Sequence, residues 1–151
     1  MDKNDPADNI RLMSHYDHDI LAWSEQQAGA LRRRAGNEID WENVAEEIES
    51  VGRSQLSAVR SHITQALLHD LKAEAWPTAL AVPHWRAEAR MQRIQAAEAY
   101  TPSMAQRIDM AKLYRDALRG MPETMDGVPP LPVPHECPVA LTELLADPDG
   151  G

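Results

Sequence analysis

Apolar residues recur every three or four positions over most of the chain, which is the spacing of one face of an α-helix. The longest such run comprises Val44, Ile48, Val51, Val59, Ile63, Ala66 and Leu67. No segment shows a sustained alternation of apolar and polar residues, which would be typical of a half-buried strand. The pattern therefore predicts an all-α protein with essentially no sheet.

Start and stop signals divide this pattern into helices, of which the first two are the clearest. The first is predicted at about residues 18–34, with Asp17 or Asp19 as its N-cap and Gly36 as a left-handed stop. The second is predicted over 40–76, with Asp40 as its N-cap, and would be ~54 Å long at 1.5 Å per residue. Gly52 is its one weak point, but an internal glycine costs only ~1 kcal/mol. A continuous second helix is therefore favoured over a break at Gly52.

Two further helices and a proline-rich tract complete the chain. The third helix is predicted from Pro83 to Tyr100, and the fourth from Thr101–Pro102 to the stop at Gly120. Six prolines fall within residues 122–138, which predicts an extended, polyproline-like segment on the surface. Leu131 and Val133 are expected to pin this segment to grooves between helices, and Pro138 to open a short last helix. The predicted fold is a four-helix up-down bundle with one long helix, a proline-rich extended C-terminal segment and a short terminal helix.

A chain of 151 residues is expected to form one domain with a substantial core. We assign residues 15–147 to a single helical domain, 1–14 to a flexible N-terminal segment and 148–151 to a tail. The polar N-terminus lacks the apolar run of a signal peptide, and no stretch of about 18 apolar residues exists. The expected location is therefore the cytoplasm, without membrane contact.

The charge balance bears on the classes of partner. Lys and Arg number 15 and Asp and Glu 24, which gives a formal net charge of −9. Nucleic acid and anionic membranes both reward a basic surface, so neither is an expected partner. Cys137 is the one cysteine, which excludes an internal disulfide framework and a zinc site built on several thiolates. No cofactor is expected.

Several segments resemble a known bacterial family. They are Tyr16-Asp17-His18-Asp19, Ala22-Trp23, Glu25-Gln26, the run from Asp40 to Ser54, His69-Asp70-Leu71-Lys72, Trp85, Pro102-Ser103 and Cys137-Pro138. Together they are similar to the small helical proteins catalogued as domain of unknown function 29, over about residues 14–147. The resemblance implies an all-helical intracellular protein with no assigned activity, and it supplies no catalytic residues.

Candidate catalytic or metal-binding residues are few. Glu46 and Glu47 lie in an acidic helical turn, His69 lies further along the same predicted helix, and Cys137 precedes a predicted helix. Carboxylates and imidazoles suit a metal, and a helix N-terminus can activate a thiol. However, on an unbroken helix Glu47 and His69 are separated by ~33 Å and cannot share an ion within one chain. Charges that complement the helix start, a solvated face, a hydrogen-bonded structural His69 and a packed Cys137 therefore account for these residues better, and no metal site is assigned.

Four arginines are the candidates for partner binding. Arg86, Arg90 and Arg93 form a basic stripe on the third predicted helix, and Arg53 lies near the acidic turn of the second. The stripe suits a phosphate or an acidic partner, and it equally suits the glutamates of a neighbouring helix.

These observations favour a non-catalytic protein-interaction or regulatory module with an unknown protein partner. The second helix outruns the others, so its surplus apolar stripe also predicts a homodimer through residues 40–76. Two alternatives remain open. One is a small metal-dependent or Cys/His hydrolase that uses the Glu/His cluster, and the other is an acidic neutralising partner of a basic toxin.

Overall fold

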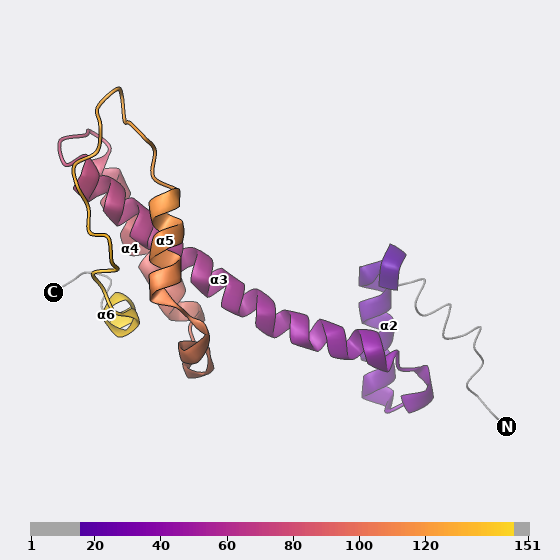
Figure 1. Ribbon diagram of the computed structural model, residues 1–151. Coiled ribbons are helices and arrows are strands. Elements are labelled where there is room, and N and C mark those ends of the chain that lie inside the picture. The colour runs from indigo at the N-terminus through magenta and orange to yellow at the C-terminus, as the bar shows by residue number, and fades with distance from the viewer. Residues whose placement is uncertain (1–15, 147–151) are drawn as a thin grey trace. The chain divides into compact units, whose positions relative to one another are not determined.

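The computed structural model describes residues 16–146, and every regular element in this range is helical (Figure 1). The elements are α2 (Ile20–Arg33), η1 (Gly36–Glu38), α3 (Trp41–Ala75), α4 (Val82–Ala99), η2 (Pro102–Arg107), α5 (Met110–Arg119) and α6 (Leu141–Ala146). The only pairing of the β type among the described residues is an isolated bridge between Met125 and Val128. The prediction of an all-α protein is therefore confirmed.

The chain divides into two compact units, Met1–Arg53 and Ser54–Gly151, and each is described by itself. The single domain over 15–147 and the up-down bundle stay predictions. The predicted flexible segment 1–14 and the tail 148–151 lie outside the described residues.

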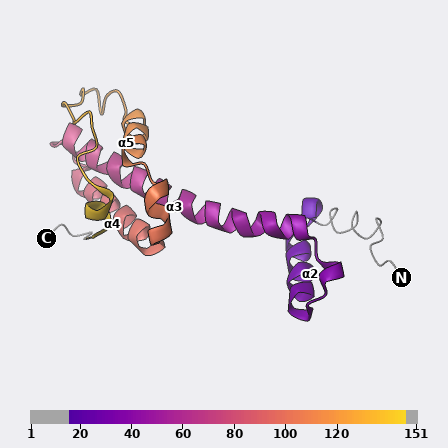
Figure 2. The same cartoon turned by 60° about the horizontal axis from the view of Figure 1, so that its bottom comes forward.

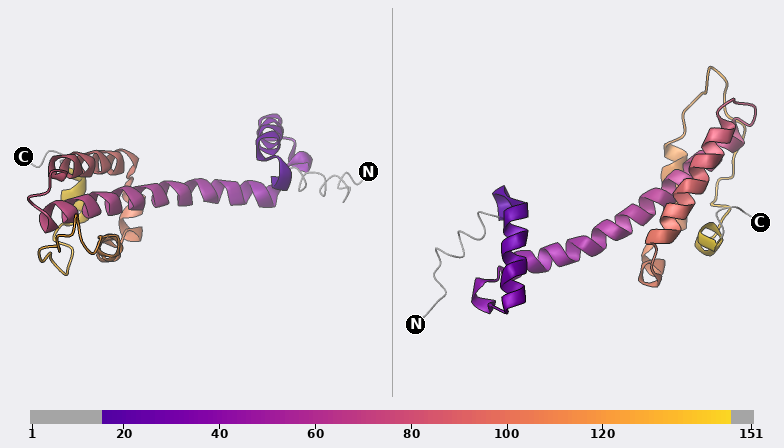
Figure 3. Two further views of the ribbon diagram at one scale, coloured as in Figure 1. Left: turned by 90° about the horizontal axis from the view of Figure 1, so that it is seen from above. Right: turned by 180° about the vertical axis from the view of Figure 1, so that it is seen from behind.

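Unit 1 contains α2, η1 and the start of α3, and Figure 3 shows α2 beside that start. Asp19 caps α2 by accepting a 3.0 Å hydrogen bond from the amide of Ala22, as predicted. The left-handed stop, however, is Arg34 (φ 55°) and not Gly36. The amide of Arg34 donates to the carbonyls of Ala30 and Leu31, so these hydrogen bonds end the helix at Arg33, three residues before the glycine.

The long helix α3 is continuous through Gly52, as predicted, and its unbroken course is visible in Figure 2. Asp40 is its N-cap and accepts a 3.4 Å hydrogen bond from the amide of Asn43. Ile39 and Val44 on either side of the cap are both buried, as expected of a hydrophobic staple. The helix ends one residue before Trp76, because Pro77 disfavours helical backbone at the residue that precedes it.

The predicted fourth helix, from Thr101 to Gly120, is two elements rather than one. Residues 102–107 form the 3-10 helix η2, Ile108 is extended, and α5 begins at Met110. Asp109 caps α5 through a 3.1 Å hydrogen bond from the amide of Lys112, and this cap competes with a continuous helix. The extended Ile108 lets both Met104 and Ile108 reach the core, where they are buried.

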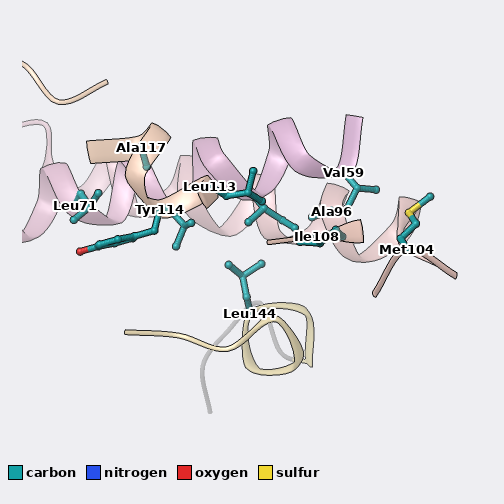
Figure 4. Packing of buried hydrophobic residues seen from close by; sticks show 11 residues of the cluster. Val59, Leu71, Ala96, Met104, Ile108, Leu113, Tyr114, Ala117 and Leu144 are labelled. Atoms are coloured by element: carbon teal, nitrogen blue, oxygen red, sulfur yellow. The ribbon is translucent and has the colours of Figure 1, made fainter. Parts of the chain in front are cut away.

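The main core of unit 2 is formed where α3, α4, η2, α5 and α6 contribute apolar side chains (Figure 4). Its buried members are Val59, Ile63, Leu67, Leu71, Ala96, Met104, Ile108, Leu113, Tyr114, Ala117 and Leu144. Leu144 reaches this cluster from α6, so the C-terminal segment is packed against the unit. The short helix begins at Leu141 and not at Pro138, because Ala140 accepts its first backbone hydrogen bond, from Leu144.

The proline-rich tract 122–138 joins α5 to α6 and contains no helix, as predicted. It opens with a two-residue turn in which Asp126 and Gly127 both have positive φ, between the bridged residues Met125 and Val128. Val133 packs against two apolar clusters, as expected. The side chain of Leu131, in contrast, is exposed, and this residue is held by its amide, which donates to the carbonyl of Ala75 at 2.9 Å.

Candidate functional site

The acidic turn at the start of α3 is engaged in local contacts within unit 1. Tyr16 donates a 2.7 Å hydrogen bond to Oε1 of Glu47, and Arg53 lies 2.6 Å from Oε1 of Glu46. The hydrogen bond to Glu47, with burial and nearby negative charges as lesser causes, raises the pKa of Tyr16 to about 12. Both predicted catalytic carboxylates therefore have partners in their own unit.

A buried polar network lies behind this turn, and sequence reasoning missed most of it. Trp23 Nε1 donates to Oδ2 of Asp40 at 3.3 Å, and the amide of Asp40 donates to Oε1 of Gln27 at 2.8 Å. Gln27 also donates to the carbonyl of Glu38, and both Gln27 and Asp40 are buried. A signal was present, because Gln27 follows Trp23 by four residues and so shares its helical face. The network fixes the loop between α2 and α3, which is a structural role.

His69 lies in unit 2 on α3, among charged residues of α3 and α4. The expected hydrogen bond is not found at its Nδ1 atom, which is buried and has no partner among the described residues. Burial, followed by the positive charge of Lys72, lowers the pKa of this imidazole. A neutral imidazole is a competent metal ligand or base.

Next to His69, Asp70 forms an ion pair with Arg93 of α4. Both side chains are about three-quarters buried, and burial raises the pKa of Asp70 although the Arg93 charge opposes this shift. Of the predicted arginine stripe, Arg93 is therefore part of a contact between α3 and α4. Arg86 and Arg90 are exposed, and Arg53 pairs with Glu46 and, at 3.6 Å, with Glu49.

Cys137 lies in the proline-rich tract and packs against the main core of unit 2. Its thiol donates to the carbonyl of Val139 at 3.2 Å, while His135, two residues earlier, is exposed. The thiol thus contacts backbone, which is the geometry of a packed structural cysteine.

These candidates are divided between the two units. Glu46 and Glu47 belong to unit 1, and His69 and Cys137 belong to unit 2. Within residues 16–146, no group of three or more His, Cys, Asp or Glu side chains has an arrangement that would hold a metal ion. None of the helices in this range has the length and apolar character needed to cross a membrane.

The most distinctive surface of unit 1 is an apolar face on the first part of α3. Trp41, Ile48 and Val51 are exposed by 60%, 67% and 64%, although they continue the stripe that buries Val44. A Cβ atom built on Gly52, beside this face, would meet nothing within 4 Å. We call Trp41, Ile48, Val51 and Gly52 the α3 face.

Comparisons with known proteins place the chain in a family without assigning it a reaction. One solved structure, an alpha-helical protein of unknown function from Rhodospirillum rubrum, is 27% identical with a TM-score of 0.62. The match covers 89% of this chain and 92% of that one. No curated protein is significantly similar to the chain. The family model described as "Domain of unknown function DUF29" matches residues 15–148, and the chain therefore belongs to this family.

Proposed function

We propose that this protein is a non-catalytic interaction module that pairs with a second copy of itself through the α3 face. The observation that carries the proposal is the exposure of Ile48 and Val51 in the middle of an otherwise buried apolar stripe. Single exposed apolar residues are common on protein surfaces, but a continuous apolar face on a helix is typical of a contact surface.

The spacing of the face suits a second helix. Trp41 and Ile48 are seven residues apart, and Val44, Ile48 and Val51 follow one another at intervals of four and three. This is the spacing at which two helices interlock their side chains along a shared seam. The occupant is therefore expected to present an apolar helix, and a second copy of α3 presents one.

The distribution of charge also favours a second copy. The net charge of −9 makes two copies repel each other over most of their surfaces. The α3 face carries no charged side chain, and Glu46 and Arg53 lie about 140° around the helix from Val51 and Ile48 respectively. There they pair with each other. Glu47, about 40° from Val51 around the helix, flanks the seam, but it accepts the Tyr16 hydroxyl within its own copy. Two copies can thus meet at this face with few like charges in contact.

Energetics predict a weak pair. Full burial of an Ile or Val side chain contributes about 1.5–3 kcal/mol. Ile48 and Val51 from two copies are four such side chains and together contribute about 6–12 kcal/mol. Association costs about 4–15 kcal/mol before any other contact is counted. Even the favourable limit of these ranges, about 8 kcal/mol, corresponds to a micromolar dissociation constant, so the expected equilibrium is weak and depends on concentration.

Sedimentation velocity of the full chain, from low to high micromolar concentration, tests the proposal. The wild type should change from monomer to dimer, and Ile48→Glu should remain a monomer. Leu80→Glu is the matched control, because it makes the same charge change at a side chain that is fully exposed on unit 2. Circular dichroism should show wild-type helix content for both variants. A wild type that is monomeric throughout, or an Ile48→Glu variant that still dimerises, would overturn the proposal.

A further inference from the structure

The segment Val128–Pro134, which we call the proline ridge, has a backbone that its own sequence restricts. Each of its seven residues is a proline or directly precedes one: Val128-Pro129-Pro130-Leu131-Pro132-Val133-Pro134. Proline fixes its own φ near −65°, and the residue before a proline is driven to extended or polyproline II backbone. No cis peptide bond occurs in the structure's described residues. The segment is therefore built for the polyproline II helix, which repeats every three residues.

The hydrogen bonds that hold the ridge follow the same three-residue spacing. The carbonyl of Val128 accepts from Trp76 Nε1 at 2.9 Å, and the carbonyl of Pro134 accepts from the Tyr114 hydroxyl at 2.6 Å. Between them, the amide of Leu131 donates to the carbonyl of Ala75 at 2.9 Å. One edge of the ridge is thus attached to unit 2 at positions 128, 131 and 134.

The rest of the ridge is presented outward. Pro129, Pro130 and Pro132 are exposed, and the side chain of Leu131 is 53% exposed although its amide is bonded inward. Only Val133 is half-buried against the unit. Prolines that served solely to pack the tract against the helices would be covered, and these are not.

We propose that Pro129-Pro130-Leu131-Pro132 is a docking ligand for a partner protein with an aromatic-lined groove of the kind that binds polyproline II segments. Such grooves take pairs of prolines at Pro-x-x-Pro spacing, which Pro129 and Pro132 provide. They gain affinity because the ligand is already extended and loses little entropy on binding. Here the fold adds to that advantage by holding the backbone at three points.

Charge further specifies the groove. Glu123, Asp126 and Glu136, which are all exposed, flank the ridge in the sequence. The partner's groove is therefore expected to be bordered by basic side chains, which would raise the association rate at low ionic strength. This surface belongs to unit 2, so the inference does not depend on self-association through the α3 face.

Three isotope-labelled domains with such grooves serve as probes: an SH3 domain, an EVH1 domain and a WW domain selected for Pro-Pro-Leu-Pro ligands. Each is titrated by NMR with the unlabelled full chain. We expect chemical-shift changes at the groove residues of at least one probe. The double variant P129A/P132A should bind that probe with an affinity at least tenfold lower than the wild type. The matched control is P83A/P102A, which removes two exposed prolines outside the ridge, at the starts of α4 and η2, and should bind as the wild type does.

A second comparison tests whether the fold presents the ridge. A free peptide of residues 124–136 should bind the responding probe more weakly than the full chain does. The variant Tyr114→Phe, which keeps the ridge sequence and removes one of its three attachments, should fall between the two. The inference is overturned if no probe shifts, if P129A/P132A binds like the wild type, or if peptide and full chain bind equally.

Discussion

The indole Nε1 atom of Trp76 donates a 2.9 Å hydrogen bond to the carbonyl oxygen of Val128, 52 residues further along the chain. Trp76 is buried, and the residue before it, Ala75, accepts the amide of Leu131. Two successive residues at the end of α3 therefore hold the proline ridge. Because the helix ends just here, the Ala75 carbonyl has no partner within the helix and is free to accept this bond.

We predict that Trp76→Phe weakens this attachment. It removes one of the two donors to the Val128 carbonyl, which also accepts from the amide of Met125 at 2.9 Å. The free energy of unfolding should therefore fall by about 0.5–1.5 kcal/mol, the net value of one hydrogen bond. Urea unfolding measures this loss. The amide of Leu131 should also exchange with solvent faster in Trp76→Phe than in the wild type, whereas amides in the centre of α3 should change less.

Trp85→Phe is the control for that variant, because Trp85 is buried in the same apolar cluster and lacks a contact with the Val128 carbonyl. It should lower stability without selectively exposing the Leu131 amide. Equal exchange at Leu131 in the two variants would show that the indole bond does not hold the ridge.

The boundaries of α3 were predictable because several local signals agree there. Asp40 supplies a cap, Ile39 and Val44 form a staple, and Pro77 ends the helix. The single opposing signal, Gly52, costs only about 1 kcal/mol and is outweighed over a long helix. An element can be predicted from the sequence when its capping, packing and chain-ending signals all agree in this way.

The errors lie where two local signals compete. Gly36 is the residue type that favours a left-handed stop, yet backbone hydrogen bonds place the stop at Arg34. Thr101–Pro102 is a valid helix start, yet Asp109 starts a second helix and Ile108 is pulled into the core. Which signal prevails is decided by tertiary packing, which a local pattern does not contain.

The proline ridge likewise combines a feature that the sequence predicts with one that it does not. The polyproline character of 128–134 follows from the order of prolines alone. Its attachment does not, because Trp76–Val128 and Tyr114–Pro134 join residues far apart in the chain. The Asp126–Gly127 turn could be predicted from the sequence, since an Asp-Gly pair is a strong signal for a two-residue turn with positive φ.

The two alternative functions, a small hydrolase and an acidic partner of a basic toxin, stay predictions.

Arg34→Gly is expected to stabilise the protein. Arg34 has φ 55° and ψ 34°, a left-handed backbone that costs a side-chain-bearing residue about 1–2 kcal/mol and costs glycine little. Thermal unfolding should show a gain of about 1 kcal/mol. Gly36→Ala makes the reverse test: its Cβ would meet only Trp41, at an ordinary 3.8 Å, so little change is expected. A large loss of stability in Gly36→Ala would show that the end of α2 depends on Gly36 rather than on Arg34.

Asp40→Ala should be among the most damaging single changes in unit 1. It removes the cap of α3, worth about 1 kcal/mol, and leaves the buried Trp23 indole without an acceptor, at about 1–3 kcal/mol. The expected loss is about 2–4 kcal/mol by urea unfolding. Asp40→Asn keeps one oxygen, which can accept from the Asn43 amide or from the Trp23 indole but not from both, so it should recover only part of that loss. Equal losses for the two variants would contradict the role assigned to the acceptor.

Stability should fall as the pH falls below 6.5, the usual pKa of histidine, because His69 is held neutral in the fold. Its lowered pKa means that the unfolded chain takes up the proton first, so the stabilisation is present above pH 6.5 and is lost on acidification. Lys72 and His84 reinforce the shift, and Glu88 and Asp70 oppose it. The raised pKa of Asp70 acts with the opposite sign, from about its ordinary value of 3.8 upward.

Urea midpoints measured between about pH 5 and pH 7 follow the slope of stability where the histidine titrates, and comparison of the wild type with His69→Gln separates its contribution from that of Asp70. His69→Gln should flatten the slope in this range, and H135Q, at an exposed histidine, should leave it unchanged. An unchanged slope in His69→Gln would mean that this imidazole titrates alike in the folded and unfolded chain.

Gly52→Ala separates the stability of α3 from its self-association. In a single copy the added methyl group meets nothing within 4 Å, so the better helix propensity of alanine should stabilise the chain by about 1 kcal/mol. In a dimer the methyl group enters the seam beside Ile48, where overpacking costs about 1–3 kcal/mol. Unfolding at low concentration should therefore show a gain, while sedimentation shows a dissociation constant raised at least about fivefold. Gly29→Ala on α2 is the control: its Cβ would approach only the flexible Arg33 guanidinium, at 3.3 Å, so it should leave the dissociation constant unchanged. A Gly52→Ala variant that is stabilised and dimerises as tightly as the wild type would place the seam elsewhere on the chain.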